Sequence, residues 1–102
     1  MKSSSESSIW KVEYPDDFAD YLKRRFSRDV QAKIIRKIEE LIPLQNPLMH
    51  PQVIPLTEER LRGKYRMKFG RIRVVFSLNS RERILLIELV ALRQKDTYRR
   101  VR

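Results

Sequence analysis

The sequence predicts an α+β fold, in which a strand and two helices precede three antiparallel strands and the helical hairpin packs on one face of the sheet. Three observations lead to this prediction. The first part of the chain carries apolar residues at helical spacing, the second part alternates apolar with polar residues, and prolines and glycines fall between these segments. At 102 residues the chain is expected to form a single domain over residues 9–102, after a disordered serine-rich leader at residues 1–8.

The first strand and the two helices are predicted from the residues up to about 42. Residues 9–14 alternate as a strand does, and Pro15 ends this strand ahead of a helix with an acidic start. The core-facing stripe of that helix follows helical spacing: Phe18, Tyr21, Leu22 and Phe26. Ser27 is a good N-cap for a second helix, expected from residue 28 to about residue 42 and ended by Pro43.

The stretch from residue 44 to residue 57 contains three prolines, Pro47, Pro51 and Pro55. Proline restricts both its own backbone and the residue before it, so an extended connector without a helix or strand is expected here. His50 lies within this connector, and we interpret it as an incidental surface residue.

From Leu61 the pattern changes to a period of two. Apolar residues alternate with basic ones up to Phe69, and Gly70 is placed for a tight turn into a second strand over residues 72–78. Asn79 and Ser80 mark the next turn. The last strand, residues 84–92, is apolar on both faces except at Glu88, as expected inside a sheet. A polar tail with a short helical turn is expected after it.

The charge is divided unevenly along the chain. Residues 1–59 carry nine basic and ten acidic side chains, whereas residues 60–102 carry fourteen basic and three acidic ones, so the net charge of +10 comes from the second part. Segregation of this kind indicates a polyanionic partner. Nucleic acid, an acidic protein segment and an anionic membrane surface all fit that description.

Composition excludes several kinds of site. Because there is no cysteine and one histidine, a disulfide framework, a thiolate metal site and a site with several imidazoles are ruled out. The N-terminus lacks the apolar stretch of a secretory signal, and no apolar run reaches the roughly 20 residues that span a bilayer. A cytoplasmic protein that does not act at a membrane is therefore expected.

The basic residues of the second part fall on one face of the predicted strands. Lys64, Arg66 and Lys68 share a face, and Arg73 joins them from the neighbouring strand if the Gly70 turn is short. Arg93 ends the last strand, and Tyr98 follows it. Charged residues that alternate along a strand often only solvate an open sheet face. However, like charges on paired strands are destabilising. A nucleic-acid surface, most simply for RNA, explains the pattern better.

Three segments, residues 61–63, 65–76 and 92–98, resemble the RelE/ParE superfamily of bacterial and archaeal type II toxins. The recurring pattern of that family is leucine-x-glycine before a basic strand, then glycine-x-(Tyr/Ile)-Arg opening the next strand, then arginine followed by tyrosine. In this chain the last two parts are Gly70-Arg71-Ile72-Arg73 and Arg93 with Tyr98. The two predicted helices match the family only in order and length.

The resemblance implies a ribosome-dependent endoribonuclease that uses no metal or cofactor. In such enzymes the ribose 2′-OH attacks the adjacent phosphate and leaves a 2′,3′-cyclic phosphate. Arg73 and Lys68 would then hold the scissile phosphate, Arg93 would assist the leaving oxygen, and Tyr98 would orient the nucleotide or transfer a proton. Arg66 stands where the RelE type often has lysine. As a catalytic residue it would bind phosphate, but an arginine cannot act as a general base, so proton transfer would fall more heavily on Tyr98. The further RNA-binding residues would be Arg62, Lys64, Arg71, Lys95, Arg99 and Arg100.

Two other functions remain open at this stage. The ParE branch has the same fold and inhibits DNA gyrase without cutting RNA. A non-catalytic protein that binds RNA or the ribosome could also use the basic sheet. A toxin of this superfamily would further imply a cognate antitoxin as partner, encoded by a neighbouring gene and acidic enough to cover the basic surface.

Overall fold

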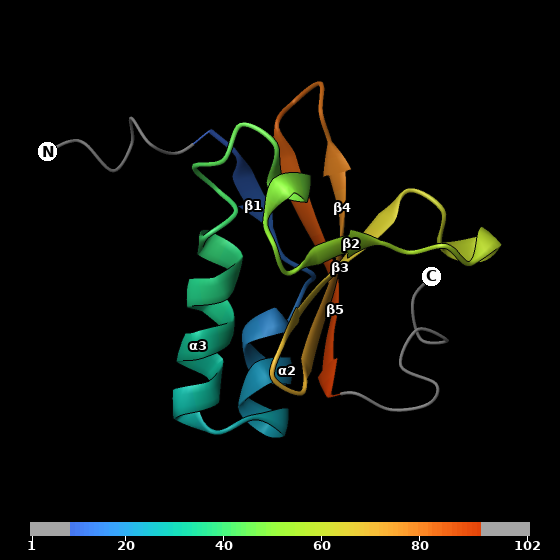
Figure 1. Ribbon diagram of the computed structural model, residues 1–102. Coiled ribbons are helices and arrows are strands. Elements are labelled where there is room, and N and C mark those ends of the chain that lie inside the picture. Colours follow the sequence, from blue (N-terminus) through green and yellow to red (C-terminus); the bar gives the residue numbers. More distant parts are fainter. Residues whose placement is uncertain (1–8, 93–102) are drawn as a thin grey trace, which may run out of the picture.

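The computed structural model describes residues 9–92, which form one sheet with two helices packed on it (Figure 1). The predicted leader at residues 1–8 and the predicted tail after Leu92 lie outside the described residues. Within residues 9–92 the sheet has five strands in the order β1-β5-β4-β3-β2. β1 (Lys11–Glu13) runs parallel to β5 (Ile84–Leu92), and every other pair of neighbouring strands is antiparallel. The α+β prediction is confirmed.

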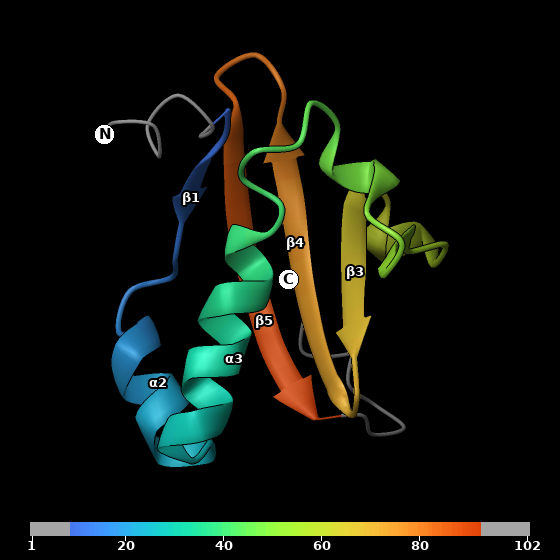
Figure 2. The same cartoon turned by 60° about the vertical axis from the view of Figure 1, so that its left-hand side comes forward.

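The two helices form a hairpin that covers one face of the sheet, as Figure 2 shows. α2 (Phe18–Arg25) and α3 (Arg28–Glu39) are separated by Phe26 and Ser27, and the Ser27 hydroxyl accepts from the Val30 backbone N–H at 3.3 Å. The predicted cap is thus confirmed. The Tyr21 hydroxyl of α2 donates to the Val90 carbonyl of β5 at 2.5 Å, which ties the hairpin to the sheet.

α3 ends at Glu39 and not near residue 42. After it, Leu41 and Ile42 donate to the carbonyls three residues earlier, Ile38 and Glu39, at 3.0 and 3.2 Å. Hydrogen bonds to the third residue back are of the 3₁₀ type, so this last turn is tighter than a turn of α-helix. The apolar periodicity continues through this turn, because Leu41 is fully buried, so the sequence pattern alone overestimates the helix.

The predicted connector over residues 44–57 is wrong, because this stretch contains regular elements. It holds a 3₁₀ turn, η1 (Pro47–Met49), and a strand, β2 (Val53–Pro55), which is followed by a second 3₁₀ turn, η2 (Glu59–Leu61). β2 pairs antiparallel with β3 (Lys64–Phe69), with Val53 opposite Met67 and Ile54 opposite Arg66. Proline is tolerated there because β2 is the edge strand of the sheet.

The hairpin of β3 and β4 (Ile72–Asn79) turns at Gly70, whose φ of +59° is in the left-handed region that favours glycine. The tight turn predicted there is confirmed. β3 itself starts at Lys64, three residues later than the alternation suggested, because Leu61 belongs to η2 and Gly63 has φ of +87°. Between β4 and β5 the register shifts at Val75 and Phe76, which leaves Glu88 without an opposite residue.

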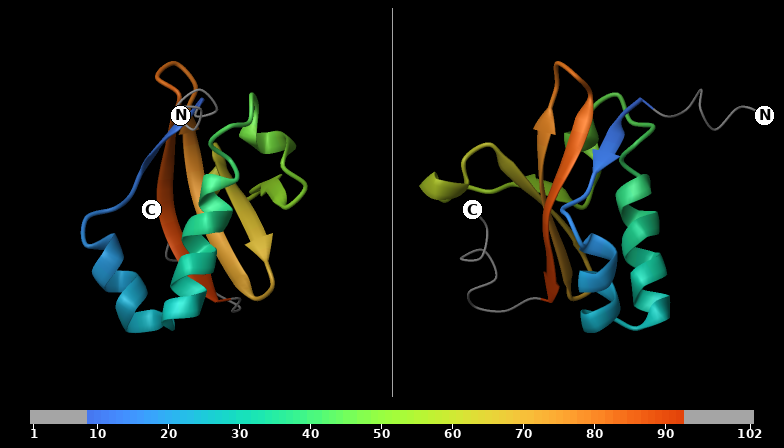
Figure 3. Two further views of the ribbon diagram at one scale, coloured as in Figure 1. Left: turned by 90° about the vertical axis from the view of Figure 1, so that its left-hand side faces the viewer. Right: turned by 180° about the vertical axis from the view of Figure 1, so that it is seen from behind.

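The main core lies between the helices and the sheet. It contains Trp10 and Phe18, and Phe76 on the middle strand, all at most 9% exposed. A second, small cluster of Leu61 and Val75 lies on the opposite face, where Leu56 and Leu89 pack against it. The segment between β2 and β3 projects on this side of the sheet, away from the helices (Figure 3). The second face is therefore partly covered and not wholly open.

Candidate functional site: a basic sheet face and its pocket

The face of the sheet opposite the helices carries the basic residues that the sequence singled out. In the ladder of β3 and β4, Lys68 is opposite Arg73, Arg66 is opposite Val75, and Lys64 is opposite Ser77. Because residues opposite each other in a ladder point to the same side of the sheet, Lys64, Arg66, Lys68 and Arg73 share one side. We call these four residues the basic face.

Arg73 is the buried member of the basic face, at 5% exposed. Its Nη1 donates to the carbonyls of Gly70 and Ile72, both at 3.1 Å, so the Gly70 turn holds this guanidinium in place. Lys68, on the facing strand, is exposed. The structure therefore puts a fixed positive charge beside a solvent-accessible one.

Arg66 and Lys68 line a pocket of about 290 Å³ together with residues from two other segments. The remaining lining residues come from the approach to β2, from β2 itself and from the turn: Pro51, Gln52, Ile54 and Gly70. We call this the basic pocket. The Nε atom of Arg66 is buried and has no hydrogen-bond partner. An unsatisfied buried donor is costly, which suits a site where a ligand supplies the missing acceptor.

Lys64 differs from the other members of the basic face because its charge is paired. Its Nζ lies 3.0 Å from Glu88 Oε2, and the Ser77 hydroxyl donates to the same oxygen at 3.1 Å. Glu88 is the residue displaced by the register shift in β5. The bulge thus supplies the one carboxylate that the ladder brings to the basic face among residues 9–92.

The other predicted RNA-binding residues lie at the margins of this face. Arg62 follows η2 and Arg71 sits in the Gly70 turn, and both are exposed. The remaining five predicted site residues lie outside the described residues: Arg93, Lys95, Tyr98, Arg99 and Arg100.

Sequence reasoning missed Gln52 and misjudged His50. Gln52 lines the basic pocket, and its carbonyl accepts from the Lys68 backbone N–H at 3.0 Å. The side chain of His50 is 11% exposed, with Nε2 at 3.0 Å from Glu40 Oε1 and Nδ1 accepting from the Gln52 N–H at 3.1 Å. His50 is therefore not incidental. The neighbouring β-branched pair Val53-Ile54 was the signal for a strand here.

Glu40 shows the effect of the His50 contact. The hydrogen bond from His50 is the main cause that holds the pKa of Glu40 below its ordinary value. Burial acts in the opposite direction, and the charge of Lys37 adds to the lowering. The carboxylate form of Glu40 is thus favoured, and it lies 3.6 Å from Lys37 Nζ.

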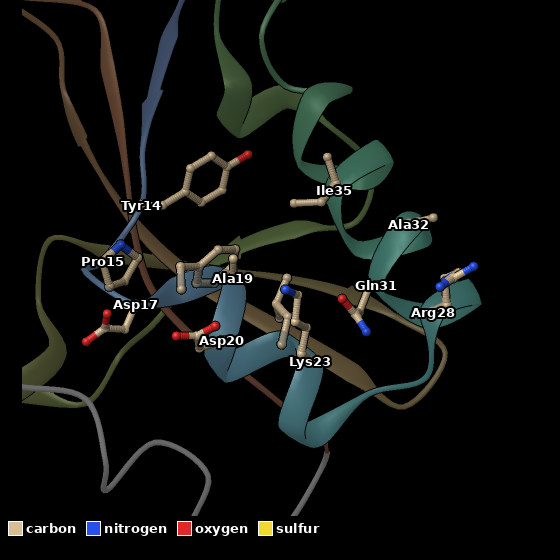
Figure 4. A pocket seen from close by; sticks show the side chains of 12 residues that line it. Tyr14, Pro15, Asp17, Ala19, Asp20, Lys23, Arg28, Gln31, Ala32 and Ile35 are labelled. Atoms are coloured by element: carbon tan, nitrogen blue, oxygen red, sulfur yellow. The ribbon is translucent and has the colours of Figure 1, made fainter.

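A larger groove, of about 810 Å³, runs between α2 and α3 on the other side of the molecule (Figure 4). Apolar side chains contribute to its lining, among them Phe18, Leu22 and Ile35. Two carboxylates, Asp17 and Asp20, lie toward one end, and the basic residues Lys23 and Arg28 lie toward the other (Figure 4). We call this the helix groove.

Residues 9–92 hold neither a metal-binding cluster nor a membrane-spanning helix. No three His, Asp or Glu side chains come together there in a way that would hold a metal ion. None of the helices in this part of the chain has the length and apolar character needed to cross a bilayer.

No protein-family model and no curated protein sequence matches the chain. Solved structures do match it. A variant of the Escherichia coli toxin RelE in the free state gives a TM-score of 0.67 at 12% identity, over 91% of this chain and 94% of that one. The RelE of the archaeal RelE–RelB complex from Pyrococcus horikoshii gives 0.66 at 18% identity, over 85% and 98%.

A third structure, the toxin–antitoxin complex RelBE2 from Mycobacterium tuberculosis, gives a TM-score of 0.63 at 18% identity, over 83% of this chain and 99% of that one. The similarity thus spans nearly the full length of three proteins from different organisms. Such low identity shows a shared arrangement of helices and strands. The chain has the fold of the RelE toxins.

Proposed function

We propose that this protein is the toxin of a type II toxin–antitoxin system and cleaves mRNA on the ribosome. The observation that carries the proposal is the alignment of Arg66, Lys68 and Arg73 on one side of β3 and β4, beside the basic pocket, in a chain with the RelE fold. The phosphates of RNA are the natural ligands of such a cluster, and several cations together suit the extra negative charge of a phosphoryl transition state.

The proposed reaction needs only the RNA and the protein. The ribose 2′-OH loses its proton and attacks the adjacent phosphorus, the bond from phosphorus to the 5′-oxygen breaks, and that oxygen takes up a proton. The products are a 2′,3′-cyclic phosphate and a 5′-OH.

Lys68 and Arg66 contact the phosphate in this scheme. Arg73 contributes a positive charge that two backbone carbonyls already hold in place, so it does not need to reorganise during the reaction. By resemblance, Arg93 assists the leaving oxygen and Tyr98 takes part in proton transfer.

The decisive experiment adds the purified protein to translating ribosomes and maps the mRNA ends. Cleavage within the codon in the ribosomal A site, lost in Arg73→Ala and Tyr98→Phe, supports the proposal. Binding to ribosomes with intact mRNA would contradict it and would favour a non-catalytic RNA-binding role. Inhibition of gyrase supercoiling with intact mRNA would favour the ParE-like role.

We also propose an antitoxin partner. Solved structures with this fold include complexes of a RelE toxin with its RelB antitoxin. The protein should express poorly alone and well together with the gene beside its own. Harmless, abundant expression of the wild-type chain alone would count against a toxin.

The helix groove suits one segment of such an antitoxin, namely an amphipathic helix. Its apolar lining residues would bury the apolar face of that helix. Asp17 and Asp20 at one end favour a basic residue of the partner, whereas Lys23 and Arg28 at the other end favour an acidic one. The charges therefore set the direction in which the helix would lie.

A further inference from the structure

The hydrogen bonds of His50 define which ring nitrogen carries the proton. The Gln52 backbone N–H can only donate, so Nδ1, at 3.1 Å from it, must accept. The proton of the neutral ring is then on Nε2, which donates to Glu40 Oε1 at 3.0 Å. One nitrogen thus holds the backbone of Gln52, and the other joins the ring to the turn that follows α3.

Gln52 is held at three atoms by three different segments. Besides the contact from its N–H to His50, its carbonyl accepts from the Lys68 backbone N–H at 3.0 Å. Its side-chain Oε1 accepts from Lys37 Nζ of α3 at 3.1 Å. An ammonium only donates, so it must meet the amide oxygen, and the Nε2 group of Gln52 keeps its two donor hydrogens.

This arrangement exceeds what is needed to start a strand of three residues. β2 pairs with β3 at only Val53, Ile54 and Pro55. Gln52 directly precedes those residues and lines the basic pocket together with Arg66 and Lys68. The contacts through His50 and Lys37 therefore hold Gln52 in place in the lining of the pocket, beside Arg66 and Lys68. The bond from Lys37 to Oε1 does not occupy the donors of the Gln52 side-chain amide.

We propose that Gln52 is a further RNA-contacting residue of the basic pocket and that His50 is its positioning residue. This inference rests on the proposed function only in that the pocket binds RNA. The Gln52 amide donates to an acceptor of the nucleotide held by Arg66 and Lys68. His50 does not touch the RNA and acts through the Gln52 backbone.

Two replacements of His50 separate the roles of its nitrogens. Asparagine places a carbonyl oxygen close to the position of Nδ1 and can accept from the N–H two residues later, as in an Asx-turn. Glutamine extends toward Glu40 and loses the acceptor close to the backbone. The control is Met49→Ala, at the residue next to His50, which is 77% exposed.

Binding is measured by the fluorescence anisotropy of a labelled single-stranded oligouridylate added to the purified full-length chain. Gln52→Leu, His50→Ala and His50→Gln should each weaken binding about fivefold, the effect of one lost hydrogen bond. His50→Asn should restore most of the loss seen in His50→Ala, and Met49→Ala should bind as the wild type does. Circular dichroism checks that each variant is folded.

A structural readout accompanies the binding assay. Long-range ¹⁵N–¹H correlation spectra of the His50 ring at neutral pH should show the proton on Nε2, and the Gln52 amide should exchange faster in His50→Gln than in His50→Asn. A proton on Nδ1, or equal binding by His50→Ala, His50→Asn and His50→Gln, would overturn the positioning role. Wild-type affinity in Gln52→Leu, or no binding of the oligonucleotide by the wild type, would overturn the contact.

These outcomes are distinct from failure of the proposed function. If mRNA stays intact on ribosomes while the oligonucleotide results hold, the nuclease proposal fails and the RNA contact of Gln52 stands. If mRNA is cut but the variants of Gln52 and His50 bind and cut as the wild type does, the nuclease stands and this inference fails.

Discussion

Lys68 lies directly opposite Arg73 in the ladder between β3 and β4. Two like charges at opposed positions destabilise a sheet, so this pair reduces the stability of the fold. We expect Lys68→Gln to raise the free energy of unfolding by about 0.5 kcal/mol, and to weaken RNA binding at the same time. Urea unfolding and anisotropy with single-stranded RNA measure the two effects.

Lys33→Gln is the matched control, because Lys33 is an exposed lysine of α3, on the helical side of the molecule. Lys33→Gln should change neither the free energy of unfolding nor the RNA affinity appreciably. A loss of stability in Lys68→Gln would contradict the expected repulsion.

The unsatisfied Nε of Arg66 leads to a second prediction. Methionine has a similar length and no polar hydrogen, so Arg66→Met should unfold at a urea concentration no lower than the wild type. RNA affinity should fall, and the slope of log K against log salt should become shallower by about 1, as one phosphate contact is lost. An unchanged slope would mean that Arg66 does not contact a phosphate.

Replacing Glu88 should change both the free energy of unfolding and the RNA affinity in the direction opposite to replacing Lys68. Its carboxylate accepts from Ser77 and pairs with Lys64, and its side chain is 27% exposed. Glu88→Gln should lower the free energy of unfolding by about 1 kcal/mol. It should also strengthen RNA binding, because one negative charge leaves the basic face and Lys64 becomes available. RNA binding by a folded Glu88→Gln protein that is no stronger than that of the wild type would contradict this expectation.

The lowered pKa of Glu40 predicts a pH dependence of stability. A carboxyl group whose pKa is lower in the folded than in the unfolded chain stabilises the fold above the unfolded pKa. That contribution is lost as the pH falls through the folded pKa. Glu40→Gln should therefore be slightly less stable than the wild type at neutral pH, and the difference should vanish in acid. Urea unfolding of both proteins over a pH series measures it, and a difference that persists in acid would contradict the charge effect.

The helix groove can be tested without disturbing the core, since Ala32 lines it and is exposed. Ala32→Glu should weaken binding of the antitoxin at least tenfold, because it puts a carboxylate into the proposed interface. Cleavage of mRNA by the free toxin should be unchanged. Calorimetric titration with the antitoxin, alongside the ribosome assay, separates the two activities, and full antitoxin affinity would exclude this groove as its binding place.

The helices and the three long strands could be predicted because each carries a periodic apolar pattern that packing then uses. Phe18 and Leu22 do face the core, and so do Val74 and Phe76 on β4. The sequence also predicts that Lys68 and Arg73 lie on the same side of the sheet, provided that the Gly70 turn is short. Local patterns suffice where an element is long enough to bury its own apolar face.

β2 could not be predicted in this way, because it is three residues long and ends in a proline. Val53 and Ile54 form a strand because they pair with the backbone of β3. The roles of His50 and Gln52 depend on that pairing and on contacts with α3, far away in the sequence. The burial of Arg73 is likewise a property of the assembled turn, since an arginine in an alternating strand is expected to be exposed.

The sheet ends on both sides in a strand of only three residues, β1 and β2, and β2 includes Pro55. A proline has no N–H to offer to a further strand, and a short edge gives an approaching chain little to pair with. A protein so rich in β-branched and aromatic strand residues would otherwise be at risk of sheet-to-sheet aggregation. Its short edges should keep it from polymerising through the backbone even at high local concentration on RNA.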